Sequence, residues 1–218
     1  MLALIVFATF AVASPTHADL ASASWTPLDE SEHDVVGKMP LHQATLKGID
    51  CYQVSATTPV AGETLLEIVI DPRKAMNWSS AEISEAEILG RTSDTVDYYQ
   101  HLRVPGWTMV ADRFWFSHGR IERTDAQLGW HYQKLEQGGD YKEAYQAHRA
   151  KHPKAVEPPV SVGSWTFRSS DAGTLVVYRV CTDVGGTLPG PVQRMATRST
   201  LPNSVSDLIL EGLRQERG

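Results

Sequence analysis

Two histidines have a spacing that could serve metal chemistry. His148 and His152 are four residues apart, which brings two imidazoles to one face of a helix. The residue after His148 is Arg149, so the metalloprotease pattern His-Glu-x-x-His is absent. Arg149, Lys151 and Lys154 would also repel a divalent ion. We therefore predict no metal site at these positions.

Four further side chains could act as acids or bases: Asp97, His101, Asp112 and Arg113. His101 stands among aromatic residues in a predicted strand, where a hydrogen-bonded core histidine is the simpler interpretation. Asp112 and Arg113 are consecutive in a predicted strand, so they would point to opposite faces. The sequence has no Gly-x-Ser-x-Gly, Walker A or dinucleotide-binding motif. An enzyme that uses these four residues stays an alternative without a recognisable catalytic constellation.

The two cysteines, Cys51 and Cys181, are too few for a metal site. In an oxidising compartment such a pair is a candidate disulfide, and the alternative is two unrelated buried thiols. The N-terminus favours export, because an apolar run over residues 1–13 and a small-x-small pattern ending at Ala18 predict a signal peptide over residues 1–18. The run is too short for a membrane span, which needs about 20 residues. We expect a periplasmic or secreted protein whose mature chain starts near Asp19.

Composition excludes one class of partner. The chain of 218 residues has a formal net charge of −6 and a pI of about 5.7. Binding a polyanion needs clustered Lys and Arg, and the short basic stretch 148–154 follows an acidic run, so we predict no nucleic-acid partner. With 42% hydrophobic residues and no linker or repeat, residues 24–218 are expected to form one domain.

The pattern of strands and helices predicts an α+β fold. Alternation predicts strands over residues 34–39 and 50–56, and helical spacing predicts a helix over 63–70. Six more strands are expected over 83–89, 95–102, 109–117, 128–134, 162–168 and 174–182, separated by turn residues. Residues 137–159 form a surface excursion with a short helix, and a long helix over 189–217 ends the chain. Pro202 should kink or break that helix near residues 200–203.

This order favours a curved antiparallel sheet wrapped around the C-terminal helix, with a cavity between them. At this point the sequence resembles the START (StAR-related lipid transfer) domains of the helix-grip superfamily, which also holds plant pathogenesis-related allergens and polyketide cyclases. The resemblance covers most of the mature chain. Short motifs carry it through their order and spacing: DCYQV at 50–54, ID at 70–71 and then Trp78, YYQH at 98–101, PGW at 105–107, DRF at 112–114, GSWTF at 163–167, YRVCTDVGG at 178–186 and LP at 188–189.

The resemblance implies a tunnel that holds one lipid-like molecule under the C-terminal helix, with no cofactor and no chemistry. We expect an apolar cavity of roughly 300 Å³ or more. Its expected ligand-binding residues are Tyr98, Trp107, Arg113, Trp115, Phe116, Trp165, Tyr178, Val192, Met195 and Ser199. For the aromatic residues, plain core packing is the alternative. Arg113 would meet a ligand head group, or else form a salt bridge at the surface or rim.

The same resemblance places the strand that precedes the first long helix antiparallel to the final strand. Cys51 and Cys181 would then face one another, and we expect a disulfide between them. The expected function is binding, and possibly transfer, of a lipid or other hydrophobic small molecule by a monomer, with transient membrane contact possible. Two alternatives stay open: an enzyme of the polyketide cyclase/hydrolase type on the same scaffold, and a ligand-free interaction module.

Overall fold

A computed structural model describes residues 13–106, 110–186 and 190–217, with side chains from residue 198 onward in the last helix. One antiparallel sheet dominates this part of the chain, and its order is β1-β2-β3-β9-β8-β7-β6-β5-β4. The strands are β1 (Thr26–His33), β2 (Gly37–Leu46), β3 (Ile49–Thr58), β4 (Ile83–Arg91), β5 (Thr95–Leu102), β6 (Arg113–Arg123), β7 (Leu128–Lys134), β8 (Val160–Ser170) and β9 (Gly173–Asp183). The predicted α+β class and the curved antiparallel sheet are confirmed.

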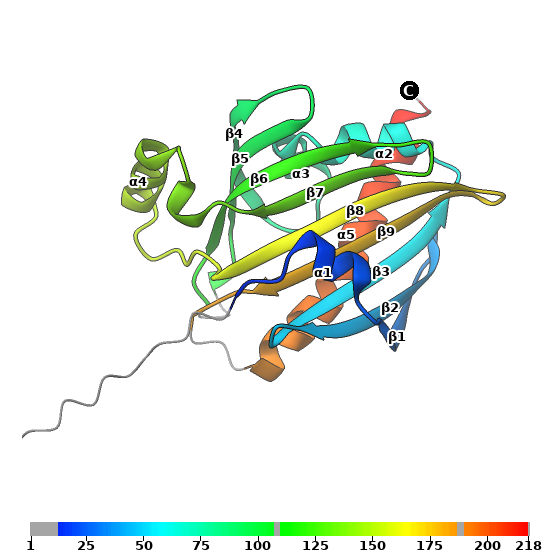
Figure 1. Ribbon diagram of the computed structural model, residues 1–218, viewed down its shortest axis with the longest axis horizontal. Coiled ribbons are helices and arrows are strands. Elements are labelled where there is room, and N and C mark those ends of the chain that lie inside the picture. The colour runs from blue at the N-terminus through cyan, green and yellow to red at the C-terminus, as the bar shows by residue number, and fades with distance from the viewer. Residues whose placement is uncertain (1–12, 107–109, 187–189, 218) are drawn as a thin grey trace, which may run out of the picture.

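The helices lie on both faces of this sheet. They are α1 (His17–Ser22), α2 (Gly62–Val69), η1 (Pro72–Lys74), α3 (Ala75–Trp78), η3 (Glu136–Gly138), α4 (Lys142–Lys151) and α5 (Gly190–Gln215). The sheet bends around α5, and α2 and α3 close the same side (Figure 1). We call the face that carries α5 the inner face and the opposite one the outer face. No helix in the described ranges is long and apolar enough to cross a membrane.

The main core lies between the inner face and helices α2 and α5. Leu65, Leu66 and Ile68 of α2 are fully buried against Val205 and Leu208 of α5. Their spacing places these apolar side chains on one face of each helix. Burial of this face stabilises each helix more than its propensity does.

Helix α5 runs from Gly190 to Gln215 with Pro202 inside it. The expected break near residues 200–203 is therefore wrong, whereas the kink that we expected as the other outcome stays a prediction. Proline removes one backbone N–H, but Leu201 and Pro202 are buried within the described part of the helix, and the residues after them pack into the core. Arg198, whose carbonyl loses its partner, is exposed, so water can satisfy that carbonyl. Packing of the apolar face outweighs the loss of one hydrogen bond.

Two strand predictions need correction. Strand β6 begins at Arg113 and not at residue 109, because the Asp112 carboxylate accepts a hydrogen bond from the Val104 backbone N–H (2.8 Å) and forms part of a loop. Residues 34–36 form a turn and not the predicted strand. Strand β1 escaped prediction because it is an edge strand with mostly exposed side chains, so its sequence lacks apolar alternation.

The predicted disulfide is confirmed. Cys51 of β3 and Cys181 of β9 face one another in register, with their Cα atoms 4.2 Å apart. Both residues are fully buried on the outer face beside Val162, and Leu20 of α1 covers them.

Helix α1 is integrated into the fold. Thr16 and Asp19 form a reciprocal capping box at its start. His17 Nε2 lies 3.0 Å from the Tyr132 carbonyl oxygen. Lys47 Nζ donates to the carbonyl oxygen of Ser14 (3.2 Å) and pairs with Asp19 (2.8 Å). The chain is thus held to the sheet from Ser14 onward.

The excursion after β7 covers a second patch of the outer face. Its helix α4 packs Ala144 and Tyr145 against Tyr99, Phe114 and Phe116 of β5 and β6. This small apolar cluster is separate from the main core. Side chains of β5 and β6 therefore alternate between the main core and the cluster beneath α4.

Candidate pocket on the inner face

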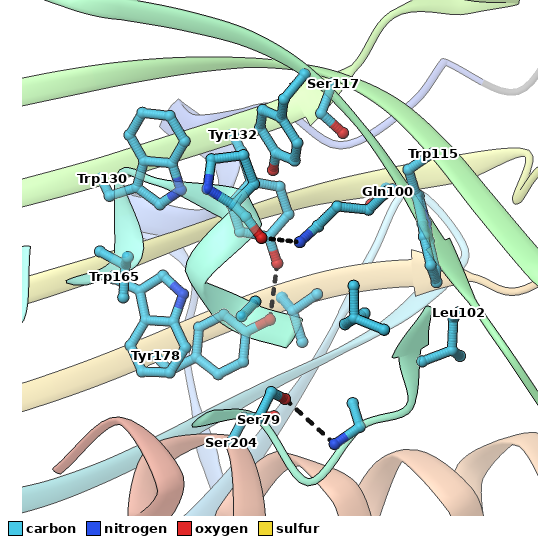
Figure 2. A pocket seen from close by; sticks show the side chains of 18 of the residues that line it. Ser79, Gln100, Leu102, Trp115, Ser117, Trp130, Tyr132, Trp165, Tyr178 and Ser204 are labelled. Carbon is cyan, nitrogen blue, oxygen red and sulfur yellow. Dashed lines mark hydrogen bonds between the residues drawn. The ribbon is translucent and has the colours of Figure 1, made fainter. Parts of the chain in front are cut away.

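The inner face holds a mostly apolar pocket beneath α3 and α5 (Figure 2). Its volume is about 260 Å³, so the expected cavity exists but is smaller than the roughly 300 Å³ that we expected. The residues that line it are Val69, Asp71, Pro72, Ala75, Trp78, Ser79, Ala81, Ile83, Tyr98, Gln100, Leu102, Trp115, Ser117, Trp130, Tyr132, Ser161, Trp165, Tyr178, Val180, Thr182 and Ser204. They come from strands β4 to β9, from α5, from the end of α2 and from the segment that follows it.

Aromatic rings form one wall of the pocket. The rings of Trp165 and Tyr178 stack with centroids 3.9 Å apart and planes 6° apart, because β8 and β9 place these residues directly opposite one another. Trp130 lies opposite Trp165 on β7, and its ring is 6.2 Å from that of Tyr98. Such a wall offers flat apolar surface to a hydrophobic or aromatic ligand.

Two glycines make room for these rings. A Cβ atom at Gly119 would lie 1.8 Å from the Trp130 ring, and one at Gly163 would lie 2.4 Å from the Tyr132 hydroxyl. Both glycines stand inside strands, where glycine is otherwise unfavourable. Their absent side chains are what lets the aromatic residues of β7 lie across the neighbouring strands.

Hydroxyl groups line the pocket behind the rings. The Tyr132 and Tyr178 hydroxyl oxygens are 2.8 Å apart, and Tyr98 is hydrogen-bonded to Ser117. Burial raises the pKa of all three tyrosines above the ordinary value, so they are neutral at physiological pH. When one hydroxyl of the Tyr132–Tyr178 pair donates to the other, the second keeps its proton for a ligand acceptor.

The segment from Asp71 to Ala81 forms the opposite wall. Gln100 Nε2 donates to the Pro72 carbonyl oxygen (3.2 Å) and ties β5 to this segment. The Asp71 carboxylate accepts from Arg73 Nε and an Arg73 terminal nitrogen (2.9 Å each), and this pairing lowers the pKa of Asp71. The buried indole N–H of Trp78 finds no acceptor among the described residues. It is a free donor for an oxygen atom of a ligand.

Four of the predicted ligand-binding residues line this pocket: Tyr98, Trp115, Trp165 and Tyr178. Phe116 does not, because it points to the outer face into the cluster beneath α4. Ser199 is exposed on α5. Trp107, and the side chains of Val192 and Met195, lie outside the described residues.

Arg113 has a different role from the one expected. It is almost fully buried at the start of β6, and it does not line the pocket. Its Nε donates to the Val184 carbonyl oxygen (2.7 Å), and its terminal nitrogens donate to the carbonyl oxygens of Gly185 (3.1 Å) and Ala111. The guanidinium therefore holds the loop that leads from β9 to α5, and these donors are not directed to a ligand.

Strand parity could have found several residues that our sequence reasoning missed. Gln100 and Leu102 share a face with Tyr98, and Ser117 shares a face with Trp115. Trp130 and Tyr132, two residues apart on β7, likewise share one face. Trp78 carried no such signal, because only the path of the chain after α2 brings it to the pocket.

The candidate acids and bases lie away from this pocket. Asp97 contacts His118 (2.6 Å) and Tyr141 (2.8 Å). His101 faces Asp112 at 3.5 Å. Neither pair lines the pocket, and within the described ranges Asp71 is the single carboxylate that does. Since Arg73 occupies that carboxylate, the lining offers no acid and base in contact with one another.

Solved structures similar to this chain share its architecture. Human STARD10 has a TM-score of 0.71 at 13% identity, over 92% of this chain and 78% of that chain. Human StAR-related lipid transfer protein 5 also gives 0.71 at 13% identity, over 90% and 89%. The STAR-related lipid transfer protein of Xanthomonas axonopodis gives 0.68 at 16% identity, over 86% and 98%.

An enzyme also shares the architecture at lower similarity. The ZhuI aromatase/cyclase of Streptomyces sp. R1128 has a TM-score of 0.53 at 15% identity, over 77% of this chain and 96% of that chain. No protein-family model matches the chain, and no curated protein sequence matches it significantly. At such identities the similarity concerns the fold. A nine-stranded antiparallel sheet curved around a C-terminal helix is the helix-grip fold of the START domains, and this chain has that fold.

Proposed function

We propose that the protein binds a hydrophobic small molecule in the pocket between the sheet and helices α3 and α5. The observation that carries this proposal is the lining itself, in which stacked aromatic rings and apolar side chains surround a few neutral hydroxyl groups. Small-molecule sites commonly combine an apolar wall with a few polar groups in this way.

The size of the pocket limits what it accepts in this conformation. A volume of about 260 Å³ equals the share of about nine water molecules, at about 30 Å³ each. A compact ring system or a short chain fits that space. A long acyl chain requires the pocket to widen. We propose that the wall segment from Asp71 to Ala81, which contains α3, moves for such a ligand.

Polar groups in the pocket indicate what the ligand carries. The Trp78 indole and the Tyr132–Tyr178 pair each offer one hydrogen-bond donor. Asp71, the single acid of the described lining, is occupied by Arg73. The ligand we propose is therefore uncharged and apolar, with one or two acceptor oxygens such as carbonyl or ether groups.

Native mass spectrometry of the protein after exposure to a lipid extract is the direct test. We expect a bound species of discrete mass in wild type and its loss in Leu102→Trp, which adds an indole at the lining of the pocket. Leu210→Trp, the same substitution at a half-buried residue of α5 outside the pocket lining, is the matched control. If neither wild type nor control retains any species, or if Leu102→Trp binds as well as wild type, the proposal is wrong.

An aromatase/cyclase-type enzyme is the second candidate, favoured only by the shared architecture. The described lining lacks an acid and base in contact, which gives proton transfer no evident agent. Conversion of a bound polyketide-like ligand, seen as a change of mass during incubation, would favour the enzyme over the binder.

We also propose that the protein is exported and contacts membranes transiently as a monomer. The buried disulfide supports an oxidising compartment. Met76 supports membrane contact, because this exposed side chain lies on α3 between Ala75 and Trp78 of the pocket lining. Cell fractionation tests the compartment, and sedimentation velocity tests the monomer. Met76→Glu should slow ligand transfer to vesicles, whereas Val35→Glu, a change at an exposed apolar residue away from the pocket, should not.

A further inference from the structure

A cluster of metal-ligating side chains lies on the outer face, away from the pocket. Glu85 of β4 and His101 of β5 are direct cross-strand neighbours, and His152 follows the last residue of α4. One ligand atom from each residue lies within 4.8 Å of those of the other two. His152 Nε2 is 3.0 Å from Glu85 Oε1, and the rings of His101 and His152 have centroids 4.0 Å apart.

His101 is the feature of this cluster that ordinary packing leaves unexplained. It is 3% exposed, and neither of its ring nitrogens has a hydrogen-bond partner among the described residues. A buried polar atom without a partner is unfavourable, because it loses the hydrogen bonds that water would give it.

We propose that Glu85, His101 and His152 bind one Zn²⁺ ion. Imidazole nitrogens and a carboxylate oxygen are ordinary zinc ligands, with bonds of about 2.0–2.2 Å. Tetrahedral ligands at that distance stand about 3.4 Å apart, so the three side chains need small movements to close on an ion. Asp112 Oδ2, which lies 3.5 Å from His101 Nε2, orients the His101 ring as an outer partner.

Some charges around the cluster favour a bound cation, and one competes with it. Glu87 lies 3.5 Å from His148 Nε2 and adds negative charge nearby. Lys151 Nζ lies 2.8 Å from Glu85 Oε1 and competes with an ion for that oxygen. The Lys151 side chain is 61% exposed, so it can turn into solvent. Zinc binding therefore exchanges an exposed ion pair, which is worth little, for metal coordination.

The ion would join three segments that are separate in the sequence. His152 ends the helix of the excursion, and Glu85 and His101 belong to the edge of the sheet. Zinc there would fix α4 over Tyr99, Phe114 and Phe116 and would not reach the pocket on the inner face. The site we propose is thus a structural one.

Zinc binding by the untagged full chain, cleared of metal with a chelator, tests the site. We expect one Zn²⁺ per chain with a dissociation constant of about 1 µM or tighter, measured by competition with Co²⁺ absorption. Glu85→Gln and His152→Gln should each weaken binding at least tenfold. Lys151→Met should tighten it about two- to fivefold, because it removes the competing ammonium group.

His118→Gln is the matched control, since His118 also contacts a carboxylate on a strand but lies outside the cluster. Circular dichroism shows whether each variant is folded, and the partly exposed His152 is chosen because replacement of the buried His101 endangers folding. His131→Gln tests whether a second group of possible ligands, His131, Glu122 and His17, binds the zinc ion. The proposal is overturned by weaker binding in wild type, by a loss smaller than tenfold in folded Glu85→Gln or His152→Gln, or by loss of binding in His131→Gln.

Discussion

Removing the disulfide should destabilise the protein by several kcal/mol. The perturbation is the double variant Cys51→Ala/Cys181→Ala, which deletes the bridge between β3 and β9. Both residues are fully buried and in register. The alanines fit the same strands, so the main effect falls on the unfolded chain, which is no longer cross-linked.

The magnitude follows from the length of the closed loop. The two cysteines are 130 residues apart, and the loop-entropy relation assigns a loop of that size about 5 kcal/mol at 25 °C. The measured stabilisation by a disulfide often falls below this figure, because the unfolded chain keeps residual structure. We expect a loss of about 3–5 kcal/mol, equivalent to a fall in Tm of about 6–20 °C at about 2–4 °C per kcal/mol for a domain of this size.

Urea unfolding of three samples measures this loss: oxidised wild type, reduced wild type and the double variant. Reduced wild type and the variant should coincide, since both lack the cross-link. Their m-values should exceed that of the oxidised protein, because a chain without the bridge exposes more surface when it unfolds. A loss below about 1 kcal/mol, or two alkylatable thiols in the oxidised protein, would refute the reasoning.

Three further predictions concern other regions. Arg113→Met should cost about 3 kcal/mol in urea unfolding, because it leaves the backbone carbonyls of Ala111, Val184 and Gly185 without their charged donor, and Arg113→Lys should recover less than half; an unchanged midpoint in the Met variant contradicts this. Burial raises the pKa of Tyr132 above that of the unfolded chain, so its contribution is complete below pH of about 10 and is lost as the pH rises further. Stability should therefore fall more between pH values of about 9 and 11 in wild type than in Tyr132→Phe, and equal losses would show that Tyr132 does not contribute. If the exported protein loses a leader, N-terminal sequencing should find Ser14 and not Asp19, because cleavage after Ala13 keeps the contacts of α1 with the sheet; a start at Asp19 would show that these contacts are dispensable.

Local pattern determined much of the fold. Alternation and turn residues located β5 and β7 with their observed bounds, since a strand with one buried face carries a period of two residues. The resemblance to START domains then placed the two cysteines opposite one another. The expected ligand-binding set also included Tyr98 and Trp115, and both line the pocket.

Other features depended on which segments meet in three dimensions. The parity of β6 gave Arg113 the same face as Trp115, yet the loop after β9 supplies carbonyls that take its guanidinium. Pro202 predicted a kinked or broken helix, but the core holds α5 together without a break. His101 and His152 had no relation in the sequence, and the path of the excursion across the outer face brings their rings together. Sequence periodicity fixes which face of an element a side chain occupies, whereas the curvature of the sheet and the routes of the loops decide which partner it meets there.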